Sequence, residues 1–276
     1  EYCDLLVAGS GPAGLSSAYA AAKNGAKVIL AEDKPRFGGS LLTDEVTIDN
    51  LSGKAWTDKI ITELKEMPNV IVKNRSQVFG YYDHNMTVMF ERTGDHLENK
   101  PKYTPRQRLW YIRAKEVLLS TGSIERPIVF GNNDTPGIFL SAAAKEYIKV
   151  YGVLVGKKPL IFTNNDSAYE TALEFKKQGI DPIILDTREE HSSELIDAAK
   201  SQNIQIKFSH AVIAANGYRK VKSAQIGRLN KEKTEFENSE TIECDCICVS
   251  GFWTPTVHLA SQSGNKLKFD DRIDAF

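Results

Sequence analysis

The chain has 276 residues, of which 41% are hydrophobic and 26% are charged, and its formal net charge is −1. This composition is typical of a globular protein with room for about two domains, and the small net charge gives no electrostatic reason to expect a nucleic acid or an anionic membrane as partner. No apolar stretch approaches the ~18 residues that cross a bilayer, and no signal peptide precedes the first expected strand. We expect a cytoplasmic protein and, since the sequence opens in a strand without an initiator Met, a piece of a longer chain.

The first forty residues carry the most informative motif, Gly9-Ser10-Gly11-Pro12-Ala13-Gly14. The apolar run 5–8 precedes it, and the small-residue run 15–22 follows it. A second apolar run, 28–31, ends on Glu32. This order predicts a strand, a glycine turn, a helix, a second strand and an acidic residue, which together form the dinucleotide-binding fingerprint.

Each residue of the fingerprint has an expected role. Gly9 permits the sharp turn, Gly11 lets the backbone approach a pyrophosphate, and Gly14 lets the helix pack closely on the sheet. The helix begins with Pro12 and Ala13, and the free N–H groups of its first turn would present partial positive charge to the phosphates. Glu32 would accept a hydrogen bond from a ribose 2′-hydroxyl and would repel a 2′-phosphate. The motif does not distinguish NAD from FAD, because the two share their adenosine diphosphate half.

A second glycine pair follows the acidic residue, in the segment Asp33-Lys34-Pro35-Arg36-Phe37-Gly38-Gly39-Ser40-Leu41. In two-dinucleotide reductases a glycine pair in this place brings the backbone against the pyrophosphate. Paired glycines also serve as plain turns, so this signal is weaker than the fingerprint. The candidate cofactor-binding residues of the segment are Asp33, Arg36, Gly38, Gly39, Ser40 and Leu41.

The next elements complete the first expected domain. The spacing predicts a helix over 51–67, a strand over 70–72, a hairpin over 78–92 that turns at residues 83–85, and a strand from 109. An apolar strand then ends in Ser120-Thr121-Gly122, where a glycine lets the chain turn beneath a cofactor. Val78 in the hairpin, together with Thr121 and Gly122, completes the candidate cofactor-binding residues.

A second strand–helix–strand unit spans residues 159–186, but its turn reads Thr163-Asn164-Asn165-Asp166-Ser167-Ala168 and contains no glycine. Side chains stand where a backbone would have to approach phosphate, and Asp166 adds an opposing charge. We therefore expect the fold of a second nucleotide domain without its binding function. A helix over 193–201, strands over 204–208, 211–215 and 221–227, and a charged turn over 230–237 follow, and the segment 247–255 closes this domain.

Three cysteines alternate at positions 244, 246 and 248, which places all three on one face of an expected strand. A metal site or a redox pair is possible in principle, but the spacing is not the C-x-x-C of a redox dithiol, and no clustered histidine completes a zinc site. We interpret them as small buried hydrophobes. The five histidines lie in loops or at the ends of expected elements, so we assign no catalytic residue and no metal ligand.

Several motifs together resemble the alpha subunit of heterotetrameric sarcosine oxidase. They are the fingerprint, Phe37-Gly38-Gly39-Ser40-Leu41-Leu42, residues 132–137, the glycine-free turn at 162–169, residues 249–255 and residues 258–264. The resemblance covers essentially the whole chain. It implies an α/β fold of two Rossmann-like βαβ domains of the FAD/NAD(P)-binding, glutathione-reductase-like type, the second inserted in the first. The expected domains are 1–153 with 254–276, and 154–253.

The resemblance also implies a function. The family demethylates sarcosine to glycine with oxygen and tetrahydrofolate, giving hydrogen peroxide and methylenetetrahydrofolate. It holds NAD in the alpha subunit, FAD on the beta subunit, FMN at the interface between them and zinc on a small subunit. This chain corresponds to the middle of alpha, without the folate domain, so we expect it to be inactive alone. Two alternatives stay open: an FAD-binding subunit of a dye-linked amine, proline or opine dehydrogenase, and a relic that binds nothing.

Overall fold

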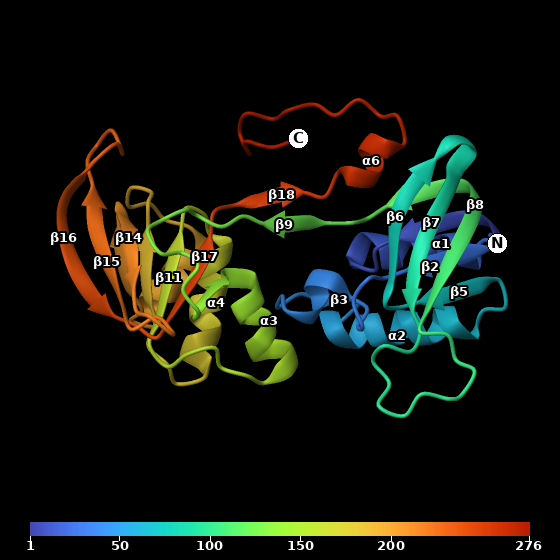
Figure 1. Cartoon of the computed structure of the whole chain (residues 1–276), viewed down its shortest axis with the longest axis horizontal. Coiled ribbons are helices and arrows are strands. Elements are labelled where there is room, and N and C mark those ends of the chain that lie inside the picture. The colour runs from blue at the N-terminus through green and yellow to red at the C-terminus, as the bar shows by residue number, and fades with distance from the viewer. The chain divides into compact units, whose positions relative to one another are not determined.

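The computed structural model describes residues 1–276, and these form two compact units. The first unit contains residues 1–123 and 255–276, and the second contains residues 124–254 (Figure 1). The chain passes between the units within the short strands β9 (Ser123–Glu125) and β18 (Trp253–Pro255). Each unit is built on its own sheet.

A six-stranded sheet with the order β5-β2-β1-β8-β7-β6 forms the centre of the first unit. The first four strands in that order are parallel, β7 pairs antiparallel with β8, and β6 pairs antiparallel with β7. The strands are β1 (Tyr2–Ala8), β2 (Val28–Ala31), β5 (Val70–Lys73), β6 (Ser76–Tyr82), β7 (Met86–Arg92) and β8 (Gln107–Leu119). Parallel pairing of β1 with both β2 and β8 brings the carboxyl ends of these strands to one edge of the sheet.

Two helices, α1 (Pro12–Lys23) and α2 (Gly53–Glu66), cover one face of this sheet. In α2 the apolar residues Trp56, Ile60 and Leu64 recur at helical spacing and pack against Val7, Val28 and Leu30 of the strands, while Ser52 caps the helix by accepting from the N–H of Ala55. A second core cluster lies on the other face of β1 and β2, where β7 and β8 contribute Met89 and Ile112. The strands β1 and β2, which precede and follow the glycine turn and its helix, are thus packed on both faces.

Smaller elements complete the first unit. They are the short helices η1 (Gly39–Leu42) and η2 (Asp83–Asn85), the strands β3 (Thr47–Ile48) and β4 (Leu51–Ser52), and the helix α6 (His258–Gln262). The side chain of Gln262 accepts a hydrogen bond from the N–H of Tyr81 on the edge strand β6. The returning segment 255–276 is therefore attached to the hairpin that the sequence predicts at 78–92.

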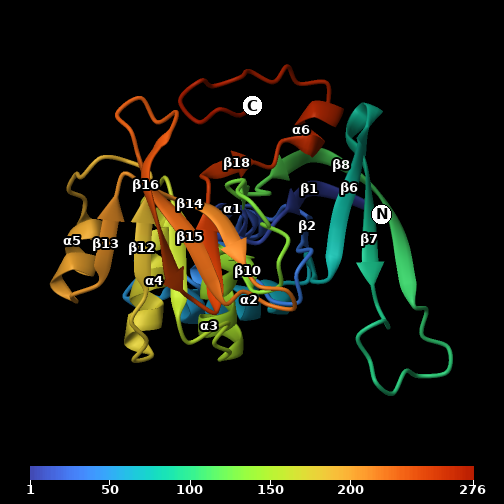
Figure 2. The ribbon, with the colours of Figure 1, turned by 60° about the vertical axis from the view of Figure 1, so that its left-hand side comes forward.

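A five-stranded parallel sheet with the order β10-β17-β11-β12-β13 forms the centre of the second unit. Three helices pack on one face, and a three-stranded antiparallel sheet, β14-β15-β16, packs on the other; Figure 2 shows these orange strands in front of the parallel ones. The strands are β10 (Ile138–Leu140), β11 (Pro159–Thr163), β12 (Ile183–Asp186), β13 (Gln205–Phe208), β14 (His210–Asn216), β15 (Ser223–Leu229), β16 (Phe236–Glu243) and β17 (Cys246–Ser250). The helices are α3 (Ser141–Tyr151), α4 (Ser167–Lys177) and α5 (Glu194–Ser201).

The α/β class and both βαβ units agree with the sequence, and two details differ. Strand β16 occupies residues 236–243, part of which the sequence predicts as a charged turn. This strand pairs only with β15, and nearly all its side chains are exposed, so it lacks an apolar alternation. The expected boundary at residue 153 falls inside the second unit, because β10 pairs with β17 and α3 packs on the same sheet. None of the helices is both long and apolar enough to cross a membrane.

Candidate dinucleotide-binding site

The turn from β1 into α1 has the geometry that its glycines predict. Gly9 has φ +102°, and a Cβ there would overlap the carbonyl oxygen of Ser120 at the end of β8. A Cβ on Gly14 would overlap the carbonyl oxygen of Gly9. These two glycines are therefore required by the turn itself and by the close approach of helix and sheet.

Gly11 differs from every other glycine in the chain. Its backbone is extended, with φ −67° and ψ −176°, and a Cβ built on it meets no protein atom within 4 Å. Each of the other 18 glycines either has a positive φ or would place a Cβ against protein atoms. Neither backbone conformation nor packing within the chain explains a glycine at this position. The space beside Gly11, which we call the cradle, is open and would let a bound group approach the backbone.

Helix α1 begins beside this space without a side-chain cap. Gly11 is its N-cap and Pro12 its first residue, so the N–H groups of Ala13 and Gly14 lie in the first turn, where an α-helix leaves them without intrahelical partners. No acidic residue stands in that turn. The helix end therefore offers free donors and partial positive charge, which suits a phosphate.

The second glycine pair lies against the first turn. The N–H of Gly38 donates to the carbonyl oxygen of Ser10 at 3.0 Å, and a Cβ on Gly39 would lie 3.0 Å from the Cα of Gly11. Both Gly38 and Gly39 have positive φ values, +119° and +55°. The two segments that the sequence separates by more than twenty residues thus form one wall of the same site.

Glu32 lies at the end of β2 and is almost completely buried beside the turn. Its Oε2 atom accepts from the N–H of Ser10 at 3.0 Å and from Ser10 Oγ at 2.5 Å, and its Oε1 atom accepts from the N–H of Lys34 at 2.9 Å. Burial, together with a hydrogen bond to the Asp33 side chain, raises the pKa of Glu32 above its ordinary value. The carboxyl group is held in one orientation at the carboxyl edge of the sheet.

The remaining candidates divide into a first group outside the hydrophobic core and a second group packed in it. Asp33, Arg36 and Ser40 are exposed beside the turn, and the carbonyl of Asp33 accepts from Arg92 at 2.9 Å. Thr121 and Gly122 follow β8 and bond to the returning segment: Thr121 Oγ1 donates to the carbonyl of Thr256, and the N–H of Thr256 donates to the carbonyl of Gly122, both at 2.9 Å.

In the second group, Leu41 is buried in the core between the sheet and its helices, and Val78 packs in the core cluster on the opposite face of the sheet. The structure therefore does not turn these two side chains toward Gly11.

The sequence predicts no role for Ser10 or Ser120, and both residues contact the glycine turn in the structure. Ser10 is fully buried and joins Glu32 to the Gly38 segment, while Ser120 Oγ donates to the carbonyls of Ala8 and Gly9, both at 3.0 Å. The signal that could have found Ser10 is a hydroxyl residue enclosed between two fingerprint glycines. Ser120 has no comparable signal, because it contacts the turn only through the tertiary fold.

The corresponding turn of the second unit, after β11, is filled by its own side chains. Asn165 is buried: its Nδ2 donates to Ser250 Oγ at 3.0 Å, and its Oδ1 accepts from the N–H of Ser167, the first residue of α4, at 3.1 Å. Asp186, at the end of β12 where Glu32 stands in the first unit, is fully buried and pairs with Arg188 at 2.7 Å. The same guanidinium also pairs with Asp166 at 2.7 Å. The side chains of Asn165 and Arg188 therefore bond to groups of this turn that would otherwise be free to bind a dinucleotide.

The cysteines are buried and unbonded, as the sequence predicts, but they do not share one face. Strand β17 begins at Cys246, and Cys246 and Cys248 pack beneath the helices. Cys244 precedes the strand and packs in the cluster of Ile247 and Val249 on the opposite side. The prediction of three cysteines on one face is wrong, because the strand does not extend back to residue 244. Burial raises the pKa of the Cys244 thiol to about 12.

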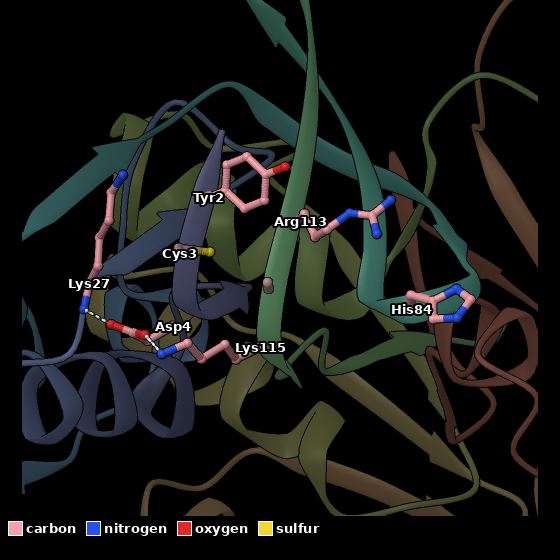
Figure 3. A pocket seen from close by; sticks show the side chains of 8 residues that line it. Tyr2, Cys3, Asp4, Lys27, His84, Arg113 and Lys115 are labelled. Atoms are coloured by element: carbon pink, nitrogen blue, oxygen red, sulfur yellow. Dashed lines mark hydrogen bonds and ion pairs between the residues drawn. The ribbon is translucent and has the colours of Figure 1, made fainter.

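A surface hollow of about 410 Å³ lies away from the glycine turn, at the start of β1 (Figure 3). The side chains drawn there include Tyr2, Lys27 and Arg113, and Lys115 Nζ pairs with Asp4 at 2.7 Å. Since β1 starts at Tyr2 and the turn follows its other end, none of the sequence-predicted site residues lines this hollow. No group of three or more His, Cys, Asp or Glu residues is arranged to hold a metal ion.

Comparisons with known proteins identify relatives of this chain. The alpha subunit of sarcosine oxidase from Rhizobium meliloti (strain 1021) is 36% identical over 266 residues, which are 96% of this chain and 26% of that protein. The opine oxidase A subunit from Agrobacterium tumefaciens (strain Ach5) is 24% identical over 304 aligned positions, covering 100% of this chain and 57% of that protein. The resemblance to sarcosine oxidase alpha subunits is confirmed, and this chain spans about a quarter of the length of the first of these relatives.

The fold also has solved counterparts. The crystal structure of L-proline dehydrogenase from P. horikoshii matches 98% of this chain and 46% of that chain, with a TM-score of 0.71 and 22% sequence identity. This likeness confirms the FAD/NAD(P)-binding type of fold. The family described as pyridine nucleotide-disulphide oxidoreductase matches residues 3–275, nearly the entire sequence. The chain therefore belongs to the pyridine nucleotide-disulphide oxidoreductase family.

Proposed function

We propose that this chain is the dinucleotide-holding part of the alpha subunit of a multi-subunit sarcosine oxidase, and that its one dinucleotide is NAD. The complete enzyme would convert sarcosine, tetrahydrofolate and oxygen to glycine, methylenetetrahydrofolate and hydrogen peroxide. The observation that carries the dinucleotide assignment is Gly11, a glycine for which the chain itself provides no reason. The 36% identity to the alpha subunit of a sarcosine oxidase supports the choice of enzyme.

The residues of the first unit fit such a group. The cradle at Gly11 leaves room for a pyrophosphate, and the amides of Ala13 and Gly14 would donate to it. Glu32 would accept from a hydroxyl of the adenosine ribose, and its charge would disfavour a 2′-phosphate. Gly38 and Gly39 would close the wall of the site with backbone alone. Bound NAD supplies a hydride-accepting nicotinamide, and nothing in our proposal requires that it react.

We assign no acid, base or nucleophile of amine oxidation to the side chains of this turn. We therefore place the oxidation of the amine outside this chain, on a flavin-bearing beta subunit that carries FAD. The same proposal includes an FMN at the interface of the two subunits, folate in a further domain of alpha, and zinc on a small subunit. The role of this chain is then to bind and orient, in a cytoplasmic assembly that acts on a small amine.

A second candidate function is the FAD-binding subunit of a dye-linked amine, proline or opine dehydrogenase. The similarity to the opine oxidase A subunit, over the whole of this chain, favours it. The two candidates share the fingerprint and differ in the dinucleotide, because NAD and FAD have the same adenosine diphosphate half. The third candidate, a relic that binds nothing, leaves Gly11 without an explanation.

The nucleotide released from the full-length protein separates these candidates. The protein is purified without added nucleotide, its visible absorbance is recorded, and it is denatured so that the released small molecules can be identified by mass spectrometry. We expect NAD, in a ratio of one per chain, from this subunit. FAD released from the isolated subunit, with a flavin absorbance band, would support the dehydrogenase candidate, and the absence of any nucleotide would support the relic.

A further inference from the structure

Ser10 connects three segments of the first unit. It lies between Gly9 and Gly11, and no part of it is exposed. Its hydroxyl donates to Glu32 Oε2 at 2.5 Å and accepts from the N–H of Gly38 at 3.3 Å. The backbone of Ser10 repeats both links, since its N–H donates to Glu32 and its carbonyl accepts from Gly38. A single residue thus ties the glycine turn to the acidic residue and to the second glycine pair.

The hydrogen bonds determine which part of Glu32 can receive a ligand. A carboxylate has about four acceptor positions, two on each oxygen. The N–H and hydroxyl of Ser10 occupy both positions on Oε2, and the N–H of Lys34 occupies one on Oε1. These three donors leave one position on Oε1, and the Asp33 side chain, which also hydrogen-bonds to Glu32, is the group that a ribose hydroxyl would replace there. Because Ser10 saturates the other oxygen, the carboxylate cannot rotate without losing two hydrogen bonds.

We propose that Ser10 is a positioning residue, whose hydroxyl orients the Glu32 carboxylate toward one ribose hydroxyl of the bound dinucleotide and links that contact to the Gly38 segment. This proposal rests on the proposed dinucleotide site. It adds a residue that does not touch the phosphates itself and acts through Glu32. The ligand class is a dinucleotide with an unphosphorylated adenosine ribose.

The surroundings of Glu32 determine how the contact responds to pH. The carboxyl of Asp33 hydrogen-bonds to Glu32. The basic residues Lys73, Arg75 and Arg92 stand on the neighbouring backbone, and Lys34 follows on the same loop. Burial and Asp33 raise the pKa of Glu32, while the hydrogen bonds from Ser10 lower it. Removing the hydroxyl therefore raises the pKa of Glu32 further. In the variant, Glu32 is then protonated, and no longer accepts from the ribose, at a higher pH than in the wild type.

The test is the affinity for NAD as a function of pH in the full-length protein, stripped of nucleotide, as wild type and as Ser10→Ala. A ribose hydroxyl donates to the ionised carboxylate, so affinity is present above the pKa of Glu32 and falls as pH falls through it. We expect Ser10→Ala to bind NAD about tenfold more weakly, the effect of one hydrogen bond to a charged group. We also expect the midpoint of its pH profile to move to higher pH.

The matched control is Ser120→Ala. Ser120 Oγ donates to the carbonyls of Ala8 and Gly9, so this variant removes a hydroxyl that contacts the same turn but makes no contact with Glu32. Its pH midpoint should equal that of the wild type. Ser10→Thr, which keeps the hydroxyl, should restore the wild-type midpoint, and Ser10→Gly replaces Ser10→Ala if the latter does not fold.

The outcomes distinguish the positioning role of Ser10 from the proposed dinucleotide site on which it rests. A midpoint that moves upward in Ser10→Ala and not in Ser120→Ala supports the positioning role. Equal losses of affinity at every pH in both variants, or no loss in Ser10→Ala, would overturn it while leaving the NAD site in place. A wild type that binds no NAD at any pH would overturn the dinucleotide site, and the role of Ser10 with it.

Discussion

Gly11 and Gly39 touch through their backbones: a Cβ on Gly39 would lie 3.0 Å from the Cα of Gly11. One residue belongs to the turn between β1 and α1 and the other begins the short helix η1, so the contact joins two segments that are distant in sequence. No side chain separates them. The wall of the candidate site is therefore made of backbone from two loops, and its shape depends on both glycines.

Substitution of Gly39 by Ala should disturb this contact. The residue has φ +55°, a region in which a non-glycine residue costs about 1 kcal/mol or more. The new methyl group would also press on Gly11. We expect Gly39→Ala to unfold at lower urea concentration than the wild type and to retain less NAD. Gly25→Ala, at another positive φ but with open space around it, is the control that should lose stability and keep NAD. Equal NAD retention in both variants would contradict the account of the wall.

The buried carboxyl of Glu32 should give folding stability a pH dependence. Its pKa is raised in the folded chain by burial and by Asp33, so the folded state binds the proton more tightly than the unfolded state. This contribution to stability is fully present below the unfolded pKa and is lost as pH rises through the folded value. We expect the free energy of unfolding of the nucleotide-free wild type to fall over this window. Glu32→Gln should lack that decrease, as measured by urea unfolding at a series of pH values, and a parallel decrease in both proteins would contradict it.

Arg188 should be important for the stability of the second unit and not for dinucleotide binding. It pairs with Asp186, which is fully buried, and with Asp166 in the glycine-free turn. Arg188→Met would leave the buried carboxylate without its cation, which costs about 3 kcal/mol. We expect a lower unfolding midpoint for this unit and an unchanged ratio of one NAD per chain. A second NAD bound by the variant would show that Arg188 alone had closed a functional site.

The sequence was sufficient for the features that depend on local pattern. Apolar runs and turn residues predicted both βαβ units, and the spacing of Gly9, Gly14 and Glu32 predicted a turn whose geometry the structure reproduces. Features that depend on tertiary contacts could not be predicted. Strand β16 has no apolar alternation because it is an exposed edge. Strand β17, expected to carry all three cysteines, starts at Cys246, so Cys244 lies before it and packs on the opposite side of the sheet.

The candidate site shows the same division. The glycines and Glu32 follow from motif spacing, since glycine and an acidic residue have expected roles at these positions. The hydroxyl of Ser10 could not be assigned from the sequence, because its partners Glu32 and Gly38 lie more than twenty residues away. In the second unit, the sequence shows that the turn has no glycines. The pairing of Arg188 with both Asp166 and Asp186 could be seen only in the three-dimensional structure.

The most direct test of the central claim is the NAD content of the full-length protein with Gly11 replaced by Val, measured beside its unfolding midpoint. The backbone at Gly11 is extended and a Cβ there meets no protein atom within 4 Å, so the fold should lose less than about 1 kcal/mol, the scale of an altered N-cap. The branched side chain would fill the cradle, and we predict that the variant folds and releases no NAD on denaturation. A folded Gly11→Val protein that still releases one NAD per chain would contradict the assignment of this turn as the dinucleotide site.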